Sequence, residues 1–369
     1  MEKLLRPARV EIDLAALDQN IKNIRAKAGK AALIYIIALL LSLVACAGVI
    51  YLLVRMNPID VYKAIFDGAL GSKRRIWITV RDLLILLCIA VGLAPAFRMR
   101  FWNIGAEGQV LVGGLVSAAL MINLADRIPN VLLIILMFAG SAAGGMIWGL
   151  IPTVFKAKWK TNETLFTLML NYVAMQIVTF CIVFWEKPKG SNAVGIINQQ
   201  TRAGWLPEMF GNDYFWNIVI VAVLTVFMFI YLKYSKRGYE IAVVGESERT
   251  ARYAGISVRS VMLRTMALSG AICGIAGFII VSGSGHTIST STAGGRGFTA
   301  IIVAWLAKFN TLSMVLIAFG ITFMEKGANQ IASQYGLNEN ASDVLLGIIL
   351  FFILGAEFFI NYKVERNHK

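Results

Sequence analysis

Charged side chains are scarce in this sequence. Asp, Glu, Lys and Arg make up 15% of its 369 residues, whereas 58% of the residues are hydrophobic and the mean hydropathy is +0.70. So much apolar surface cannot be buried inside one soluble core of this length. Apolar runs of about 20 residues, the length that crosses about 30 Å of bilayer hydrocarbon, recur along the chain. The alternating pattern of a membrane β-barrel is missing. The sequence therefore predicts an all-α fold, a polytopic helical bundle integral to a membrane.

Histidine and cysteine are also rare, with two and four copies. Each cysteine falls in a separate apolar run without the spacing of metal ligands, so all four are predicted to be small core residues. An enzyme within the membrane would need a nucleophile paired with a base, and His286 has no acidic residue near it in the sequence. We therefore expect no metal site, no cofactor and no enzymatic activity in this chain.

Acidic residues are outnumbered, because 35 Lys and Arg against 21 Asp and Glu give a formal net charge of +14. The basic residues gather between the apolar runs, mainly on one predicted side, and the positive-inside rule makes that side the cytoplasm. Both termini are predicted to lie there. Because the charge follows membrane orientation, the expected partner is the lipid bilayer and not nucleic acid.

Ten apolar elements are predicted, with a short external helix after the first. The elements cover residues 31–54, 77–97, 103–125, 131–155, 165–185, 214–234, 261–281, 298–307, 312–326 and 341–360. Residues 1–30 are predicted to form a cytoplasmic N-terminal extension, 31–362 a transmembrane domain and 363–369 a cytoplasmic tail. Spaced glycines within 140–149 and 270–277 predict close helix crossing.

A polar stretch, residues 103–109, interrupts the apolar pattern at the start of the third span. If this stretch is helical, Asn103 and Glu107 share one stripe, and Gly105 and Gln109 share the next. Ionisable groups inside a membrane are costly and face a protein interior or a water-filled path. The stretch therefore predicts a surface for a partner helix and a polar solute. Glu107 is either a ligand of that solute or an acceptor that stabilises a helix start.

Three further polar features accompany the spans. Asn171 is predicted at mid-membrane, where its amide bonds either a neighbouring helix or a solute. Arg81 and Asp82 stand at the start of a span, where both side chains can reach the interface or form a functional pair. The Gly-rich run 282–297 precedes a short apolar stretch and predicts a broken helix at an external gate.

The charged cytoplasmic loop 235–260 is predicted to contain a short helix over residues 247–254. Gly245 and Gly255 flank this helix, and Gly255 suits the position just after its last turn. A small helix bounded by glycines fits a cleft in another protein. The alternative is an ordinary solvated loop.

Four motifs, taken in order, resemble the permeases of ABC importers for branched-chain amino acids, ribose and nucleosides. They are residues 103–109, 167–172, 245–256 and 295–301. The resemblance covers residues 31–362 and is most similar to nucleoside importer permeases of the guanosine type. It implies a substrate path at Asn103, Gly105, Glu107, Gln109 and Asn171. It implies coupling to an ATPase at Gly245, Glu246, Ala251, Arg252, Gly255 and Ile256, and an external gate at Gly295, Gly297 and Phe298.

The resemblance also implies a function and partners. The chain would be a permease subunit in a bacterial plasma membrane and would carry nucleosides or simple sugars. Its partners would be a cytoplasmic ATP-binding subunit, a second permease subunit in a heterodimer, and an extracytoplasmic solute-binding lipoprotein. The sequence has no Gly-x-x-x-x-Gly-Lys-Ser/Thr loop, so ATP must bind on another subunit. The alternative is an ion-coupled secondary transporter or channel, which Glu107 and the pair Arg81 and Asp82 favour and the scarcity of intramembrane charge opposes.

Residues 1–30 are similar to the opening of alanine racemases. The motif that carries the cofactor-binding lysine of those enzymes does not follow, because a predicted span begins at Ala31. Thirty residues cannot build a pyridoxal enzyme, so we expect a cytoplasmic extension or a fusion remnant without catalysis.

Overall fold

The computed structural model of the chain describes residues 58–334 without residue 187, together with a few isolated positions. Those positions are residues 37, 40, 41, 44, 45, 48, 51, 336, 344, 347, 348, 351, 352 and 355. The chain divides into two compact units, residues 69–326 and residues 1–68 with 327–369. The predicted extension 1–30 and tail 363–369 lie outside the described residues. The first and last predicted spans, 31–54 and 341–360, contain only isolated described positions, so they stay predictions.

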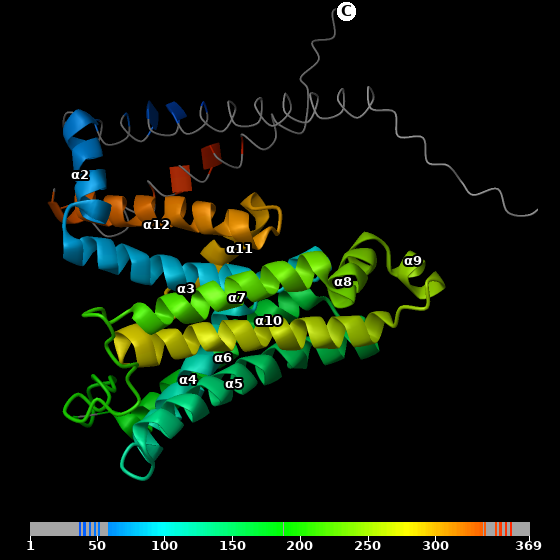
Figure 1. Cartoon of the computed structure of the whole chain (residues 1–369), viewed down its shortest axis with the longest axis horizontal. Coiled ribbons are helices and arrows are strands. Elements are labelled where there is room, and N and C mark those ends of the chain that lie inside the picture. The colour runs from blue at the N-terminus through cyan, green and yellow to red at the C-terminus, as the bar shows by residue number, and fades with distance from the viewer. Residues whose placement is uncertain are drawn as a thin grey trace, which may run out of the picture. The chain divides into compact units, whose positions relative to one another are not determined.

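Seven helices in the described part are long and apolar enough to cross a membrane (Figure 1). They are α3 (Lys73–Arg98), α4 (Ala106–Leu124), α5 (Asn130–Trp159), α6 (Glu163–Trp185), α7 (Phe215–Tyr234), α10 (Val258–Ile280) with the π-turn η1 (Val281–Gly285), and α12 (Thr311–Gln334). Eight of the ten predicted apolar elements thus coincide with helices, the eighth being the short α11 (Arg296–Leu306). Within residues 58–334 no strand occurs, and α2 (Pro58–Leu70) is the short helix predicted before the second span.

Polar side chains set several helix starts. Asn162 caps α6 by accepting hydrogen bonds from the backbone N–H groups of Thr164 (3.0 Å) and Leu165 (3.3 Å). Ser72 caps α3 by accepting from the N–H of Arg75 at 3.3 Å. Each side chain satisfies donors that the first helical turn leaves without a partner.

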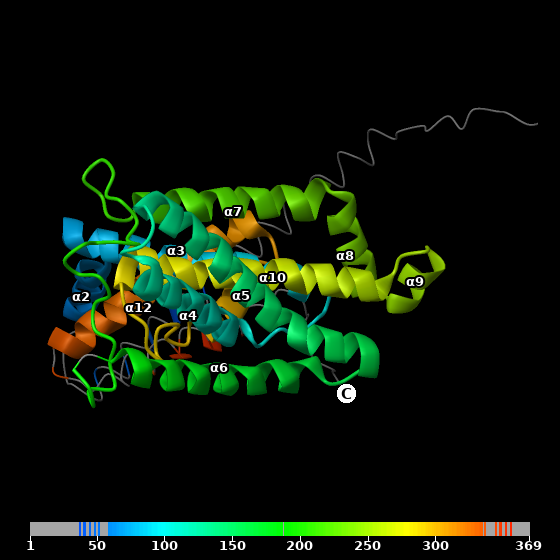
Figure 2. The same cartoon turned by 90° about the horizontal axis from the view of Figure 1, so that it is seen from below.

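Helix α10 lies at the centre of the larger unit and packs against α3, α4 and α5 (Figure 2). Glycines make these crossings close. A Cβ atom at Gly270 would collide with the backbone of Gly145, and one at Gly277 would collide with the backbone of α4. Small residues let helix backbones approach in this way, so the predicted close packing is confirmed.

Two short helices follow α7 at one end of this unit, α8 (Lys236–Glu246) and α9 (Glu248–Tyr253) (Figure 2). Ser235 ends α7 and begins α8, because its hydroxyl accepts from the N–H of Gly238 at 3.0 Å. The sequence prediction contained α9 but not α8. At the opposite end of α7, the loop 188–213 packs on the turn after α10, where the N–H of Leu206 donates to the carbonyl of Ser282 at 3.0 Å.

Candidate functional site

The third span begins with non-helical backbone. Residues 101–104 are not helical, and α4 starts only at Ala106. The Asn103 side chain accepts a hydrogen bond from the N–H of Gly105 at 3.1 Å. Such a local bond competes with helix formation. The prediction that Asn103 and Glu107 share a helical stripe is therefore wrong.

A reciprocal amide pair joins the non-helical segment to the helix. The amide nitrogen of Asn103 donates to Oε1 of Gln109 at 3.3 Å, and that of Gln109 donates to Oδ1 of Asn103 at 3.2 Å. Both side chains are buried. Buried amides are stable only when bonded, so this pair holds the entry of α4 in one conformation.

Asn171 on α6 forms hydrogen bonds with the backbone at the start of α4. Its Oδ1 accepts from the N–H of Gly108 at 2.9 Å, and its Nδ2 donates to the carbonyl of Ile104 at 2.9 Å. The hydroxyl of Thr167, one turn earlier on α6, accepts from the N–H of Ile104 at 3.2 Å. Of the two roles predicted for Asn171, the structure therefore shows the bond to a neighbouring element.

Glu107 connects the predicted path to the predicted gate. Its carboxylate oxygens accept from the N–H of Gly295 at 2.7 Å and from the N–H of Gly297 at 2.8 Å, and the residue is buried. Gly297 lies so close that an added Cβ would be 2.6 Å from the backbone nitrogen of Glu107. Since Gly295 is the N-cap of α11, Glu107 places a negative charge at that helix N-terminus, where the helix dipole favours anions.

The N-termini of α4 and of the short helix α11 thus meet at one carboxylate. Helix α11 has eleven residues, or about 17 Å at 1.5 Å per residue, too short to cross a bilayer. The predicted broken helix is confirmed. Phe298, the third predicted gate residue, is 42% exposed and lies outside the hydrogen-bonded junction.

A second buried carboxylate lies among basic side chains that the sequence prediction did not connect. Asp82 on α3 is 1% exposed and pairs with Nε of Arg81 at 2.9 Å and with Nη2 of Arg296 at 3.1 Å. Lys326 on α12 pairs with its other oxygen. The carboxylate of Asp82 is therefore enclosed by protein and does not extend to the membrane–water interface. Its ion pair with Arg296 connects α3 to the first turn of α11. The sequence feature that could have indicated this cluster is the charged pair Arg81 and Asp82 at the start of a predicted span.

The predicted coupling residues surround α9. The hydroxyl of Ser247 caps this helix by accepting from the N–H of Thr250 at 3.2 Å. Gly255 follows the helix with φ of +75°, and the N–H of Ile256 donates back to the carbonyl of Ala251 at 2.9 Å. The predicted helix and its glycine terminus are confirmed.

The coupling residues divide into an inner and an outer set. Ala251 and Gly245 are buried, and Gly245 on α8 lies so close to the backbone of Arg98 that a Cβ would collide with its carbonyl. Glu246 and Arg252 are exposed. Helix α8 thus rests on the end of α3, seven residues before Gly105, and its outer set is available to another protein.

Comparisons with known proteins place most of the chain in one family. Residues 76–354 match the family model described as the permease component of the branched-chain amino acid transport system. The chain is similar to the guanosine ABC transporter permease protein NupP of Bacillus subtilis, with 30% identity over 87% of this chain and 92% of the relative. It is also similar to the nucleoside permease NupB of Lactococcus lactis, at 29% identity over 80% and 84% of the two chains. The glucose permease TsgB13 of Haloferax volcanii is 27% identical over 88% and 87%.

Proposed function

The chain belongs to the permease family of branched-chain amino acid transport systems, and from this membership we propose that it forms part of the path by which a neutral polar solute enters a bacterial cell. It is a multi-pass membrane subunit of an ABC transporter and not itself an enzyme. Family membership implies an ATP-binding subunit and a solute-binding protein as partners. It supports the ATP-driven permease and not the ion-coupled alternative.

Nucleosides, or simple sugars, are the solutes that we propose. The relatives are named for guanosine, nucleosides and glucose, which share a ring that carries several hydroxyl groups. The buried carboxylate of Glu107 at the junction of α4 and α11 is compatible with a neutral solute. Both oxygens of Glu107 accept backbone N–H groups at the start of α11, so its negative charge is directed at that helix N-terminus and not at a cationic solute.

The path, in this proposal, passes the junction where α4 and α11 begin. Asn103, Gly105, Glu107, Gln109 and Asn171 shape its wall, and Gly295, Gly297 and Phe298 form the gate. The observation that carries the proposal is the pair of bonds from Glu107 to Gly295 and Gly297, because it connects two of the four family-like motifs. Short helices such as α11, whose N-termini lie inside a membrane protein, are typical of solute sites.

Coupling to ATP hydrolysis would start at the outer face of α9. A displacement of α8 would reach the end of α3 through Gly245 and Arg98, and the segment after Arg98 leads directly into α4. The proposed ATP-binding subunit therefore acts on the same junction that carries the gate, without contact to the solute.

Reconstituted transport tests this function. The chain would be purified with its ATP-binding subunits and a second permease and placed in vesicles with the solute-binding protein. We expect ATP-dependent uptake of radiolabelled guanosine or glucose, and ATP hydrolysis that rises when the loaded binding protein is added. The control is a complex with a hydrolysis-deficient ATP-binding subunit. Uptake driven by an ion gradient without ATP would contradict the proposal.

A further inference from the structure

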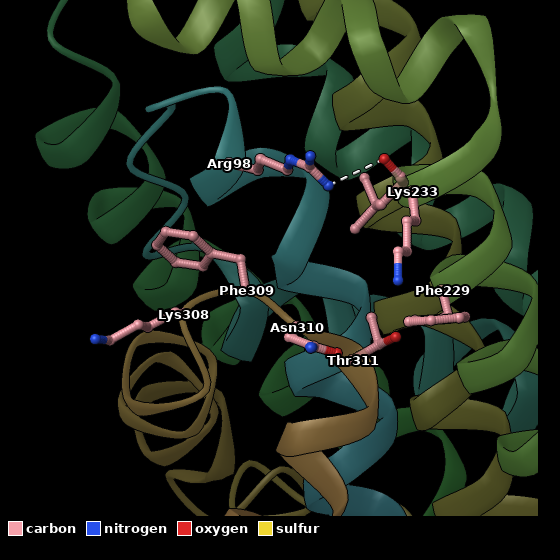
Figure 3. Close-up of a pocket in the computed structure, with 8 residues that line it drawn as sticks. Arg98, Phe229, Lys233, Lys308, Phe309, Asn310 and Thr311 are labelled. Atoms are coloured by element: carbon pink, nitrogen blue, oxygen red, sulfur yellow. Dashed lines mark hydrogen bonds between the residues drawn. The ribbon is translucent and has the colours of Figure 1, made fainter. Parts of the chain in front are cut away.

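A basic cavity of about 300 Å³ lies where α3 and α7 end and α12 begins (Figure 3). It is separate from the junction of α4 and α11. Eight residues line it, namely Arg98, Phe229, Leu232, Lys233, Lys308, Phe309, Asn310 and Thr311. Among these eight described residues three are basic and none is acidic. The cavity therefore concentrates positive charge that the predicted transport function does not use.

Two of the basic groups are held in place by neighbouring atoms of α7. Nη1 of Arg98 donates to the carbonyl of Leu232 at 3.0 Å, and the amino group of Lys233 lies 5.2 Å from the ring centre of Phe229. Figure 3 shows Arg98 and Lys233 on the same side of the cavity, whereas the amino group of Lys308 points away from them. Arg98 and Lys233 thus offer two cations on one side of the cavity to a bound anion.

The start of α12 adds a site for negative charge. This helix begins at Thr311 and has 24 residues, and Asn310 caps it by accepting from the N–H of Leu312 at 3.1 Å. The N-terminus of a helix favours an anion through its dipole and its N–H groups without partners. Cations from two elements and a helix N-terminus from a third therefore meet in one cavity.

Thr311 gives an independent indication of a ligand. The residue is 1% exposed, and its hydroxyl oxygen has no hydrogen-bond partner among the described residues. A buried hydroxyl without a partner is energetically unfavourable, and such groups are rare in folded proteins. An oxygen atom of a bound anion in this cavity would satisfy it.

We propose that this cavity binds the phosphate of an anionic phospholipid headgroup. Basic pockets between membrane helices suit such headgroups, and about 300 Å³ is room for the headgroup and not for its acyl chains. The two bordering helices offer surfaces for the chains. Val226 and Ile230 on α7 are each 51% exposed, and Leu312 and Leu316 on α12 are 48% and 76% exposed. These one-turn spacings give each helix an apolar stripe that starts at the cavity.

A bound headgroup would act beside the coupling elements. Arg98 contributes its side chain to the cavity and its backbone to the contact with Gly245 on α8. Neutralising the cations at this point would remove their mutual repulsion and hold the end of α3 in place. The lipid is thus a structural ligand and does not depend on which solute is transported.

Native mass spectrometry of the purified complex tests the proposal. The complex would be stripped of lipid in detergent and titrated with phosphatidylglycerol, with phosphatidylcholine as the zwitterionic comparison. We expect preferential binding of phosphatidylglycerol, weakened about tenfold by Lys233→Gln and by Thr311→Val, since each change removes a charge-assisted contact. The matched control is Lys158→Gln, because Lys158 also lies near a helix end and over an aromatic ring, at 4.5 Å from Trp159.

A second set of measurements distinguishes a bound lipid from a soluble anion and from a loss of folding. Thr311→Val removes a buried hydroxyl without a partner among the described residues, so it should leave the melting temperature unchanged or raised while it weakens lipid binding. Inorganic phosphate would be titrated in parallel. Displacement of phosphatidylglycerol by millimolar phosphate would assign a soluble anion and overturn the lipid. Equal lipid binding by Lys233→Gln and Lys158→Gln would overturn the site.

Discussion

Glu107 is the residue on which the junction depends, and its replacement by Gln is the first prediction. Both carboxylate oxygens accept backbone N–H bonds from the start of α11. Gln keeps one acceptor but directs an NH₂ group at the other N–H, so we expect a loss of about 1–3 kcal/mol in the free energy of unfolding. The order of preference among nucleosides and sugars should stay the same. Thermal unfolding of the purified complex and competition uptake measure the two effects.

The matched control for this change is Glu208→Gln. Glu208 pairs with Arg202 at 3.0 Å, but both side chains are more than half exposed. A surface pair of this kind contributes about 1 kcal/mol or less. A Glu107→Gln complex with unchanged stability and an altered order of solutes would show that Glu107 is a solute ligand.

Asp82 supports the second prediction at the residue scale. Its carboxylate is the shared partner of Arg81, Arg296 and Lys326. Asp82→Asn would leave these partly buried cations close together without their counter-charge, at a cost of up to about 3–5 kcal/mol. The double variant with Lys326→Met should recover part of the lost stability, because one unpaired cation is removed with it. Equal melting temperatures for the wild type and Asp82→Asn would contradict this role.

Single residues were predictable where their role is local. Gly255 was recognised as the residue that ends a helix because capping depends on residues within one turn. The partners of Glu107 lie almost 190 positions away along the chain, and no local pattern indicates them. Asn103 was misplaced on the helix because its side chain bonds the backbone two residues on, a local competitor that helix periodicity alone does not reveal.

At the scale of elements, the end of α9 gives the third prediction. Gly255 has φ of +75° and no atom within 4 Å of an added Cβ. Gly255→Val therefore costs conformational energy, about 1–2 kcal/mol, and does not cause a collision. The valine should turn α9 out of its orientation, so transport and ATP coupling should fall while the protein still inserts and purifies.

Gly195 in the loop 188–213 provides the control. Its φ is +70°, and it also has open space around its Cβ position. Gly195→Val thus introduces the same strain far along the chain from α9. If both variants transport equally well, α9 is not the coupling helix.

The loop 188–213 supports the fourth prediction, which concerns pH. The rings of Trp205 and His286 stack with centres 3.7 Å apart, and the N–H of Ile197 donates to the carbonyl of His286 at 2.8 Å. Burial lowers the pKa of His286 below its ordinary value of 6.5. A backbone hydrogen bond with Val281 opposes this effect, and the positive charge of Arg202 adds to it.

The sign of the pH effect follows from this lowered pKa. The docked loop favours neutral His286, so the undocked loop binds more protons at pH values below about 6.5. Acidification from pH 7.5 to 5.5 should therefore loosen the loop, measured as faster proteolysis between residues 188 and 213. His286→Asn suits the left-handed backbone at this position, where φ is +51°. Its cleavage rate should not depend on pH, and a wild-type rate that is constant over this range would contradict the assignment.

Long apolar helices were easier to predict from the sequence than short polar ones. The long apolar runs predicted α3, α5, α6 and α7 to within a few residues, because membrane helices must satisfy their backbone internally. Helix α8 was missed although Ser235 caps it and Ile241 and Val244 lie buried on one face. Its polar composition resembles a solvated loop, so only the cap and the spacing of those two residues could have indicated it.

For the molecule as a whole, the sequence was sufficient to predict the family, because four separate motifs occur in the same order as in that family. The way these motifs meet was not predictable. Residues 103–109, 167–172 and 295–297 converge on one junction through hydrogen bonds between α4, α6 and α11. Sequence spacing carries no information on such contacts, since each one joins helices that the chain visits far apart.

The number of chains in the complex is the last prediction, and it follows from the one proposed coupling helix, α9, in the described part of the molecule. The chain has no phosphate loop, so ATP must be bound elsewhere. Paired ATP-binding subunits related by symmetry need two docking helices, and one copy of this chain supplies one. We expect four chains, namely this chain, a shorter permease relative and two ATP-binding subunits. Native mass spectrometry of the intact complex would count copies of this 40.5 kDa chain. A complex with two copies of this chain and no shorter relative would exclude the heterodimer but not the transport function. A complex of one permease chain and one ATP-binding subunit would contradict the prediction that two docking helices are needed.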